Sequence, residues 1–211
     1  KWYRASGAQL CVVVAALAEI AFATLNLSTM PGYLTAERGL SERWVGAALG
    51  AFLFSETVLK GRFGSWADRI GTARPLGIGA VLATLSAALT LLMPNGPVMP
   101  YGMVALRLLD GVAAAMIWPS IFAWAGGLAR NAAERAQMMG AVNACYLIGV
   151  ALAFPIGGFA NDFFGTKSAW IAVSLGVFVM LALAAVRVGR VKSTATGSEA
   201  VDQSPIPVGW R

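Results

Sequence analysis

The chain has 211 residues, of which 58% are hydrophobic and 12% are charged, and its mean hydropathy is +0.69. This composition excludes an ordinary water-soluble domain and is typical of a polytopic membrane protein. The net charge of +6 would favour nucleic acid in a soluble domain, but here the Arg and Lys residues fall between long apolar runs, as in membrane loops. We therefore expect the lipid bilayer, and no nucleic acid, as a partner.

Six apolar runs are long enough to cross a bilayer as helices. They lie near residues 9–30, 44–60, 75–93, 98–125, 138–160 and 168–187. We predict an all-α fold in which residues 1–190 form one bundle of six transmembrane helices. Residues 191–211 are rich in Ser, Thr, Gly and Pro, and this composition predicts a flexible cytoplasmic tail or a linker.

The Lys and Arg residues near the ends of these runs predict the orientation of the chain. With the N-terminus inside the cell, eleven of them fall on the cytoplasmic side and three on the outer side. The eleven are Lys1, Arg4, Lys60, Arg62, Arg69, Arg74, Arg130, Arg135, Arg187, Arg190 and Lys192, and the three are Arg38, Arg43 and Lys167. We expect a multi-pass protein of the plasma or inner membrane with both termini in the cytoplasm.

A short pattern, Gly-x-x-x-Asp-x-x-Gly-Thr, occurs twice, in GRFGSWADRIGT (61–72) and PIGGFANDFFGT (155–166). Each shared position in the second copy lies 94 residues after its match in the first, as for Gly64 and Gly158. Three predicted spans separate the copies, and an odd number of crossings puts them on opposite faces of the membrane. The sequence therefore predicts two three-helix repeats of inverted topology, a construction found in secondary transporters. Chance recurrence of short glycine turns is the alternative.

The first copy resembles the loop signature of the major facilitator superfamily, Gly-x-Leu-x-Asp-Arg-x-Gly-Arg-Lys. Gly64, Asp68, Arg69 and Gly71 match it, and Arg74 is the only cation that follows. The resemblance implies that Asp68 faces a helix end in another half of the transporter, and that the nearby Arg residues help to latch one state. An anion is favoured at such a helix end by its unpaired N–H groups.

Two further stretches are similar to motifs of the same superfamily. RLLDGVAAA in the fourth span is similar to Arg-x-x-Gln-Gly-x-Gly, with Asp110 in the Gln position. GAVNACYLIGVALAFPIGG in the fifth span resembles the glycine-rich antiporter motif. The residues concerned there are Gly140, Gly149, Pro155, Gly157 and Gly158. This resemblance favours antiport or efflux, although small residues also simply allow helices to pack closely.

Six helices are half of the usual twelve in this superfamily, so the resemblance implies a chain that corresponds to the N-terminal half, as a fragment or a half-size member. A C-terminal six-helix half or a second copy of the chain would complete it. The implied function is transport of a small-molecule substrate by alternating access. The alternative is a six-helix module that does not transport but scaffolds or regulates a membrane complex.

Charged residues inside the spans are candidates for proton coupling, because each costs about 2.5 to 3.5 kcal/mol near a helix centre. Arg107 and Asp110 lie three residues apart and can pair on one helix face, and Arg107 matches an Arg of the superfamily that is implicated in proton coupling. Glu19 has no cation three or four residues away, and such a carboxyl group can take up and release a proton as access alternates. A purely structural role is the alternative for all three. Glu56 precedes Lys60 by four residues near the end of its span, which favours a solvated ion pair.

Polar and aromatic residues deep in the spans are candidates for the lining of a substrate site, with core packing as the alternative for the aromatic ones. They are Asn26, Trp118, Trp124, Asn143 and Tyr146. The chain has no histidine, no nucleotide-binding loop and no nucleophile with a base at recognisable spacing. We therefore predict no enzymatic activity, no metal site and no cofactor.

Overall fold

A computed structural model describes residues 6–195 of the chain, and only the backbone is described for Ser6 and residues 189–195. The described part is helical throughout apart from short connections, and it contains no strand. This confirms the predicted all-α fold. Lys1, Arg4 and the predicted tail beyond Ala195 lie outside the described residues.

The first predicted span is one long helical column. It consists of α1 (Ser6–Ala23), η2 (Thr24–Thr29), α2 (Met30–Gly32) and η3 (Tyr33–Glu37). In η2 and η3 the backbone widens to π-helical hydrogen bonding. This geometry is rare and occurs mostly as local bulges within α-helices, frequently at functional sites. The column therefore carries two irregular turns within one continuous crossing.

Five further helices correspond to the other predicted spans. They are α3 (Glu42–Ile70), α4 (Ala73–Leu92), α5 (Met99–Leu128), α6 (Ala132–Phe164) and α7 (Lys167–Ala195). The sequence predicted Glu56 near the end of its span. Because α3 continues to Ile70, Glu56 lies instead in the middle of this helix. Because α7 continues to Ala195, the first residues of the predicted tail are helical.

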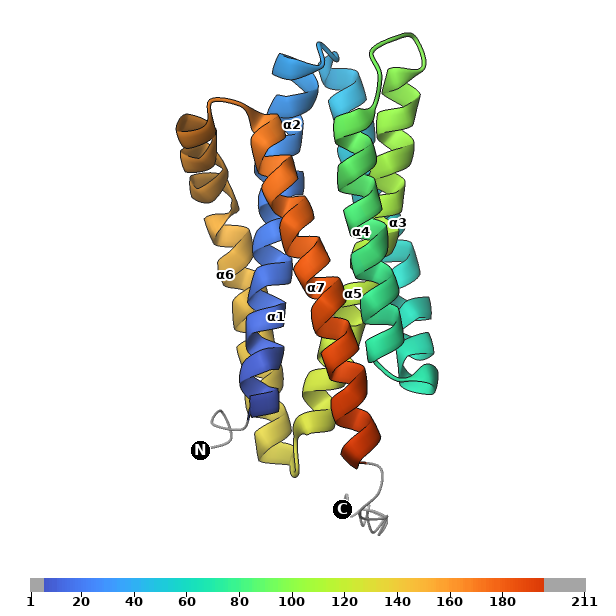
Figure 1. The fold of residues 1–211 in the computed structure, drawn as a ribbon, viewed down its shortest axis with the longest axis vertical. Helices are drawn as coiled ribbons and strands as arrows, with labels where there is room; N and C mark the ends of the chain where they lie inside the picture. The colour runs from blue at the N-terminus through green and yellow to red at the C-terminus, as the bar shows by residue number, and fades with distance from the viewer. Residues whose placement is uncertain (1–5, 196–211) are drawn as a thin grey trace, which may run out of the picture.

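The helices run alternately up and down the bundle, so the first residue of α1 and the last of α7 lie at the same end (Figure 1). We call this the terminal end. The turn after α3, at Gly71, lies at the terminal end, and the turn after α6, at Gly165, lies at the opposite end (Figure 1). Both glycines have positive φ angles, 86° and 72°, which favour glycine over residues with a Cβ. The two copies of the repeated motif thus occupy opposite ends, as inverted repeats require.

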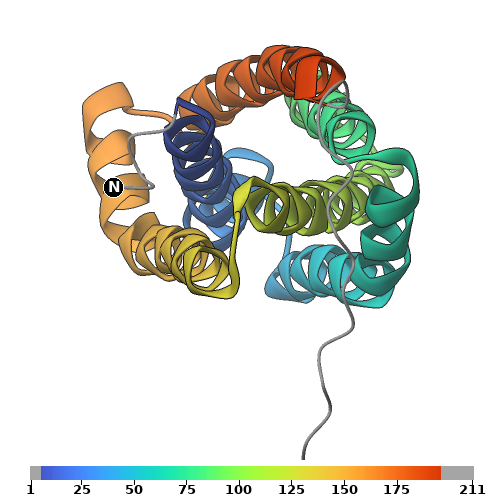
Figure 2. The same ribbon diagram turned by 90° about the horizontal axis from the view of Figure 1, so that it is seen from below.

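The two repeats, α1 to α4 and α5 to α7, pack through exchanged contacts. The middle helix of each repeat packs on the first helix of the other, α3 on α5 and α6 on α1, and α4 packs on α7. Viewed along the bundle, α5 runs through the middle, beside α1, α3 and α4 (Figure 2). Glycines permit both exchanged contacts: a Cβ on Gly111 would clash with the Phe52 carbonyl oxygen, and one on Gly157 would lie 2.6 Å from the Cβ of Ser28.

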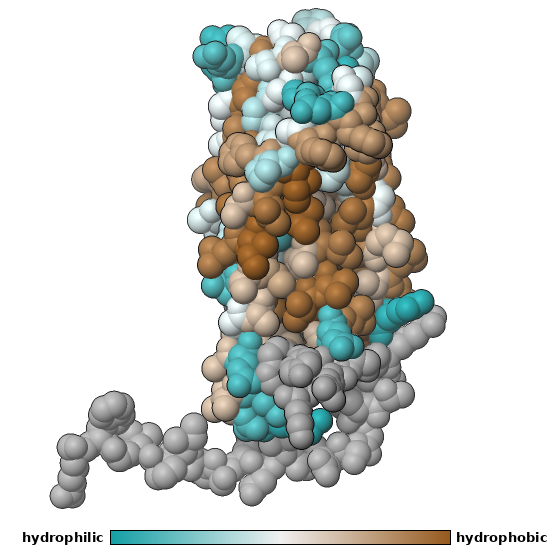
Figure 3. Space-filling model, turned by 90° about the vertical axis from the view of Figure 1, so that its left-hand side faces the viewer, coloured by the Kyte–Doolittle hydropathy of each residue, from teal (hydrophilic) through white to brown (hydrophobic). Residues whose placement is uncertain are grey.

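The surface carries a broad apolar belt between two polar ends (Figure 3). Large apolar side chains of α6, such as Leu147, Phe154 and Phe159, are exposed within it. Among the described residues, five helices are long and apolar enough to cross a membrane: the α1 column, α4, α5, α6 and α7. The more charged α3 falls below that hydropathy, and it packs along α5 over its length. The molecule is a membrane helix bundle.

Candidate functional site

A buried polar cluster surrounds Arg107 in the middle of the bundle. The side chain of Arg107 is only 1% exposed, and it forms four hydrogen bonds. Its Nη1 donates to Oδ1 of Asn26 and to Oδ2 of Asp110, both at 3.1 Å. Its Nη2 donates to Oγ of Ser86 at 3.1 Å and to Oγ1 of Thr90 at 3.0 Å. One guanidinium therefore joins the α1 column, α4 and α5.

Asn26 takes part in this cluster through both ends of its amide. Its Nδ2 donates to Oδ2 of Asp110 at 2.9 Å and to the carbonyl oxygen of Phe22 at 3.1 Å, while its Oδ1 accepts from Arg107. Asn26 stands in the π-helical turn η2, where the widened backbone accompanies its position beside the ion pair. This residue, a predicted substrate ligand, is thus engaged in holding a buried charge pair.

Ser86 and Thr90 are members of the cluster that sequence reasoning missed. They lie four residues apart on α4, and each hydroxyl also bonds to a carbonyl oxygen: Ser86 to that of Leu106, and Thr90 to that of Ser86. Two small polar residues at this spacing share one face of a largely apolar helix, and that pattern could have indicated them.

The ion pair between Arg107 and Asp110 leaves two buried polar atoms without a partner among the described residues. These are Nε of Arg107 and Oδ1 of Asp110. Removing two charges from water costs several kcal/mol per ion, and the pair offsets this only when further hydrogen bonds complete it. The four bonds of Arg107 meet most of this requirement, and the two open atoms mark where a water molecule or a moved side chain could bind.

Glu19 does not belong to this cluster and lies before Asn26 in the α1 column. Its side chain is 4% exposed and forms no hydrogen bond with any described residue. It lines a hollow of about 70 Å³ together with Asn26, Glu56, Trp118 and Tyr146. This space can hold a small number of water molecules beside the carboxyl groups. Glu56 is itself paired with Lys60, with 2.7 Å between Oε1 and Nζ.

A larger cavity of about 390 Å³ lies next to this hollow. Its lining includes Lys60, Trp118, Phe122, Asn143 and Tyr146. The rings of Trp118 and Tyr146 meet edge to face, with centroids 5.1 Å apart, and form a wall shared by the two hollows. The structure thus brings together three of the predicted substrate-lining residues.

Trp124 is the predicted lining residue that the structure places elsewhere. It is 4% exposed, belongs to the buried apolar core, and lines neither of these two hollows. The sequence could not separate it from Trp118, because both are large aromatic residues on α5 and differ only in the helix face they occupy.

The glycines of the predicted antiporter motif divide between two faces of α6. Gly149 and Gly157 face the α1 column and contact Glu19 and Ser28, whereas a Cβ added to Gly140 or Gly158 would have no atom within 4 Å. One glycine of the motif, Gly149, thus lies directly against the buried side chain of Glu19. Pro155 lies inside α6 and lines an outward-facing apolar hollow with Phe159 and Trp170.

The predicted gating motif lies at the terminal end, at the junction of α3 and α4, and not within the polar cluster. Asp68, Arg69 and Arg74 are exposed and form no ion pair within the described part of the chain. Gly64 faces Pro119 of α5, where a Cβ would make an ordinary contact at 3.6 Å. Gly71 ends α3 with its positive φ angle.

Among residues 6–195, no group of three or more Cys, Asp or Glu side chains is arranged to hold a metal ion. Cys11 and Cys145 are both free thiols. The functional groups of the site in the described bundle are therefore carboxyl groups, a guanidinium, amides and aromatic rings.

This bundle contains a buried charge pair and, apart from it, an aromatic cavity, features expected of a membrane transport protein. Residues 12–211 match the family model of the Major Facilitator Superfamily, and the chain belongs to that superfamily. This confirms the family predicted from the loop and helix motifs. The members of this superfamily are transporters and not enzymes, which agrees with the predicted absence of enzymatic activity.

The chain is also similar to Multidrug resistance protein 2 of Bacillus subtilis (strain 168). The two are 27% identical over 163 residues, which cover 74% of this chain and 39% of that protein. The chain therefore spans about two fifths of the length of this relative.

Proposed function

We propose that this chain works in secondary active transport of a small solute across a plasma or inner membrane, by alternating access and with proton coupling. The observation that carries the proposal is Glu19, a carboxyl group in the middle of a membrane helix, 4% exposed and without a hydrogen-bond partner among the described residues. Such a group is costly to keep unless it has a function.

Glu19 is the proton carrier in this scheme. It lines the small hollow with Glu56, and the hollow adjoins the aromatic cavity through Trp118 and Tyr146. A carboxyl group in this position can be wetted from one side in one state and from the other side in the next. Its protonation then depends on the side to which it is open.

Arg107 and Asp110 have a different role from that of Glu19 in this scheme, because they already form an ion pair with each other. The four hydrogen bonds of Arg107 reach the α1 column and α4. A movement of either helix would break some of these bonds, so the pair couples helix position to the charge state of the core. Asp68, Arg69 and Arg74 would latch one state at the terminal end.

The substrate binds, in this scheme, in the cavity lined by Trp118, Asn143 and Tyr146. Aromatic walls with one amide and one nearby cation suit a small amphipathic molecule. Export is the favoured direction, since the glycine motif of α6 resembles that of antiporters and the relative from Bacillus subtilis is named for multidrug resistance. A C-terminal six-helix half or a second copy of the chain would cover the exposed apolar face of α6.

Proteoliposomes test this proposal. Vesicles that contain the full chain, with any partner that co-purifies, are loaded with a panel of fluorescent amphipathic substrates and subjected to an imposed pH gradient. Glu19→Gln is expected to abolish the flux that depends on the gradient, whereas Glu42→Gln, an exposed change at the start of α3, is expected to retain it. Gradient-driven flux that survives Glu19→Gln would overturn proton coupling through this residue.

A second candidate function is a non-transporting module that scaffolds or regulates a membrane complex. The exposed apolar side chains of α6 favour it, because they form a continuous surface for another membrane protein. Absence of flux from every oligomer, together with stable binding to one membrane protein, would favour this alternative.

A further inference from the structure

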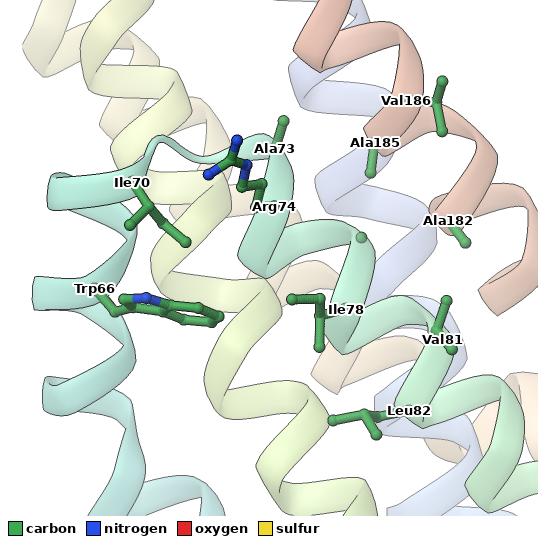
Figure 4. A pocket seen from close by; sticks show the side chains of 11 residues that line it. Trp66, Ile70, Ala73, Arg74, Ile78, Val81, Leu82, Ala182, Ala185 and Val186 are labelled. Atoms are coloured by element: carbon green, nitrogen blue, oxygen red, sulfur yellow. The ribbon is translucent and has the colours of Figure 1, made fainter.

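An apolar groove runs along α4 at the terminal end. No residue of the proposed proton and substrate sites lines it, and Arg74 is the one residue that it shares with the proposed latch. The groove encloses about 730 Å³ between the end of α3, the first half of α4 and the last part of α7. Figure 4 shows Trp66 and Ile70 on α3, facing Arg74 and Ile78 on α4. The other side of the groove is formed by small or branched residues, Gly77, Val81, Ala182, Ala185 and Val186.

The groove opens sideways, toward the lipid that surrounds the bundle. Ile78, Val81 and Val186 are 44%, 49% and 53% exposed, respectively. Small residues bring α4 close to α7, since a Cβ on Gly77 would lie 3.4 Å from that of Ala185. The surface between α4 and α7 is therefore recessed, and its apolar side chains can accommodate an acyl chain.

Arg74 is the one charged residue of this groove. Its side chain lies over the gap between α3 and α4, on the same side as Trp66 and Ile70 (Figure 4). It is exposed and forms no ion pair with the described residues. The terminal end around it is rich in cations, such as Arg69 and Arg187. The groove thus combines apolar walls with a positive charge at one end that forms no ion pair among the described residues.

The second copy of the repeated turn, at residues 155–166, shows which charge lies beside the first residues of the helix that follows it. There the carboxylate of Glu37 accepts hydrogen bonds from the backbone N–H groups of Lys167 and Ser168, the first two residues of α7. By the interval of 94 residues, their equivalents are Ala73 and Arg74, the first two residues of α4. An anion therefore occupies this position in the second repeat.

No acidic side chain of the described residues fills the equivalent position at α4. Thr72, which precedes the helix, is 2% exposed, and its Oγ1 has neither a capping bond nor any other hydrogen-bond partner within residues 6–195. Pro75 has no N–H group and that of Leu76 donates to the carbonyl oxygen of Thr72, so the N–H groups of Ala73 and Arg74 are the free ones in the described first turn of α4. They lie at the positive end of the helix dipole with the Arg74 guanidinium. These groups together suit a phosphate.

We propose that this groove binds an anionic glycerophospholipid. Its phosphate lies at the start of α4 beside Arg74, and its acyl chains follow the apolar walls along α4. The indole of Trp66 lies at the level where aromatic rings meet headgroups. Basic pockets between membrane helices recognise such headgroups through the same combination of charge and apolar surface. The inference goes beyond the transport function and does not depend on it.

Native mass spectrometry of the full chain, released from detergent micelles doped with either phosphatidylglycerol or phosphatidylcholine, tests this proposal. The wild-type chain is expected to retain phosphatidylglycerol in preference to phosphatidylcholine. Arg74→Ala should weaken that retention about fivefold, the factor that corresponds to one basic residue near an anionic membrane surface. Arg130→Ala, an equally exposed change at the same end but away from the groove, is the matched control. Ala182→Phe, which fills the groove, should reduce retention while Arg74 is present.

Three results would overturn the proposal. One is equal retention of the two lipids, and another is an equal loss in Arg74→Ala and Arg130→Ala. The third is cross-linking of two copies through cysteines placed at Val81 and Val186, which would show that a second chain covers the groove. Thermal unfolding in the same micelles separates loss of binding from loss of folding, since Arg74→Ala should melt like the wild type in phosphatidylcholine. Free inorganic phosphate should not replace the lipid, because it cannot occupy the apolar walls.

Discussion

Gly149 of α6 lies directly against Glu19 of α1, so that a Cβ at position 149 would stand 2.9 Å from the Cβ of Glu19. Real Cβ atoms essentially never approach this closely. The absence of a side chain on α6 therefore decides where the buried carboxyl group can sit. The glycine motif of the fifth span and the acidic residue of the first span, which are unrelated in sequence, form one structural unit.

Gly149→Ala is expected to destabilise the bundle by about 1 to 2 kcal/mol. The added methyl group must displace the α1 backbone beside Glu19, an overpacking effect of about 1 to 3 kcal/mol, and the better helix propensity of Ala offsets only part of it. Gly140→Ala is the matched control, because position 140 is exposed and nothing lies within 4 Å of its Cβ. That variant should be as stable as the wild type or slightly more so. Unfolding in mixed detergent micelles, followed by tryptophan fluorescence, measures both, and equal stabilities would contradict the close contact.

Arg107→Ala is expected to cost about 3 to 5 kcal/mol, because it leaves Asp110 as an unpaired charge with 0% exposure. The double variant Arg107→Met with Asp110→Leu should be more stable than Arg107→Ala, since it removes both charges. Ser86→Ala should cost only about 1 kcal/mol, because Arg107 keeps its other partners. The same unfolding assay compares the three, and a double variant that is less stable than Arg107→Ala would argue against a desolvated pair.

The class of fold could be read from the sequence because it depends on hydropathy and charge over long windows. The helix boundaries were less certain. Apolar composition ends near residue 60 in the second span, yet α3 continues to Ile70, and Gly64 in this continuation still faces Pro119 of α5. The π-helical turns of the first column could not be predicted, because residues 24–37 carry no distinctive pattern and the widening is set by tertiary contacts.

The charged residues of the candidate site could be predicted from the sequence, but the side chains that hydrogen-bond to them could not. Arg107 and Asp110 could be paired from their spacing on one helix face. Asn26 was expected to face substrate, and its place in the ion pair depends on the approach of the α1 column to α5, which no local pattern encodes. A buried polar residue can serve either purpose, and only the three-dimensional packing distinguishes them.

Glu37→Gln is expected to weaken the attachment of the α1 column to α7 by about 0.5 to 1 kcal/mol. The carboxylate now accepts from the first N–H groups of α7, a charge-assisted cap that an amide replaces only in part. Glu42→Gln is the control, because Glu42 is equally exposed but caps no other helix. Hydrogen exchange measured by mass spectrometry should show faster exchange in the first turn of α7 for Glu37→Gln alone. Unchanged exchange there would mean that the cap does not persist in the membrane.

The inverted arrangement predicts that the two copies of the repeated turn face opposite sides of the membrane. Asp68 and Asp162 are both exposed, and each lies in the last turn of its helix. Three crossings, α4, α5 and α6, separate the two sites, so a thiol at each should be reachable from one side only (Figure 1). Asp68→Cys and Asp162→Cys, each in a chain with Cys11→Ala and Cys145→Ala, are labelled in intact cells with a maleimide that cannot cross the membrane. We expect label on Asp162→Cys in intact cells, and on Asp68→Cys only after the membrane is opened, because the surplus of Lys and Arg lies at the terminal end.

Labelling of both from the same side would contradict the inverted topology. Labelling of Asp68→Cys alone in intact cells would keep the inversion and reverse the predicted orientation, and with it the side from which Glu19 receives its proton.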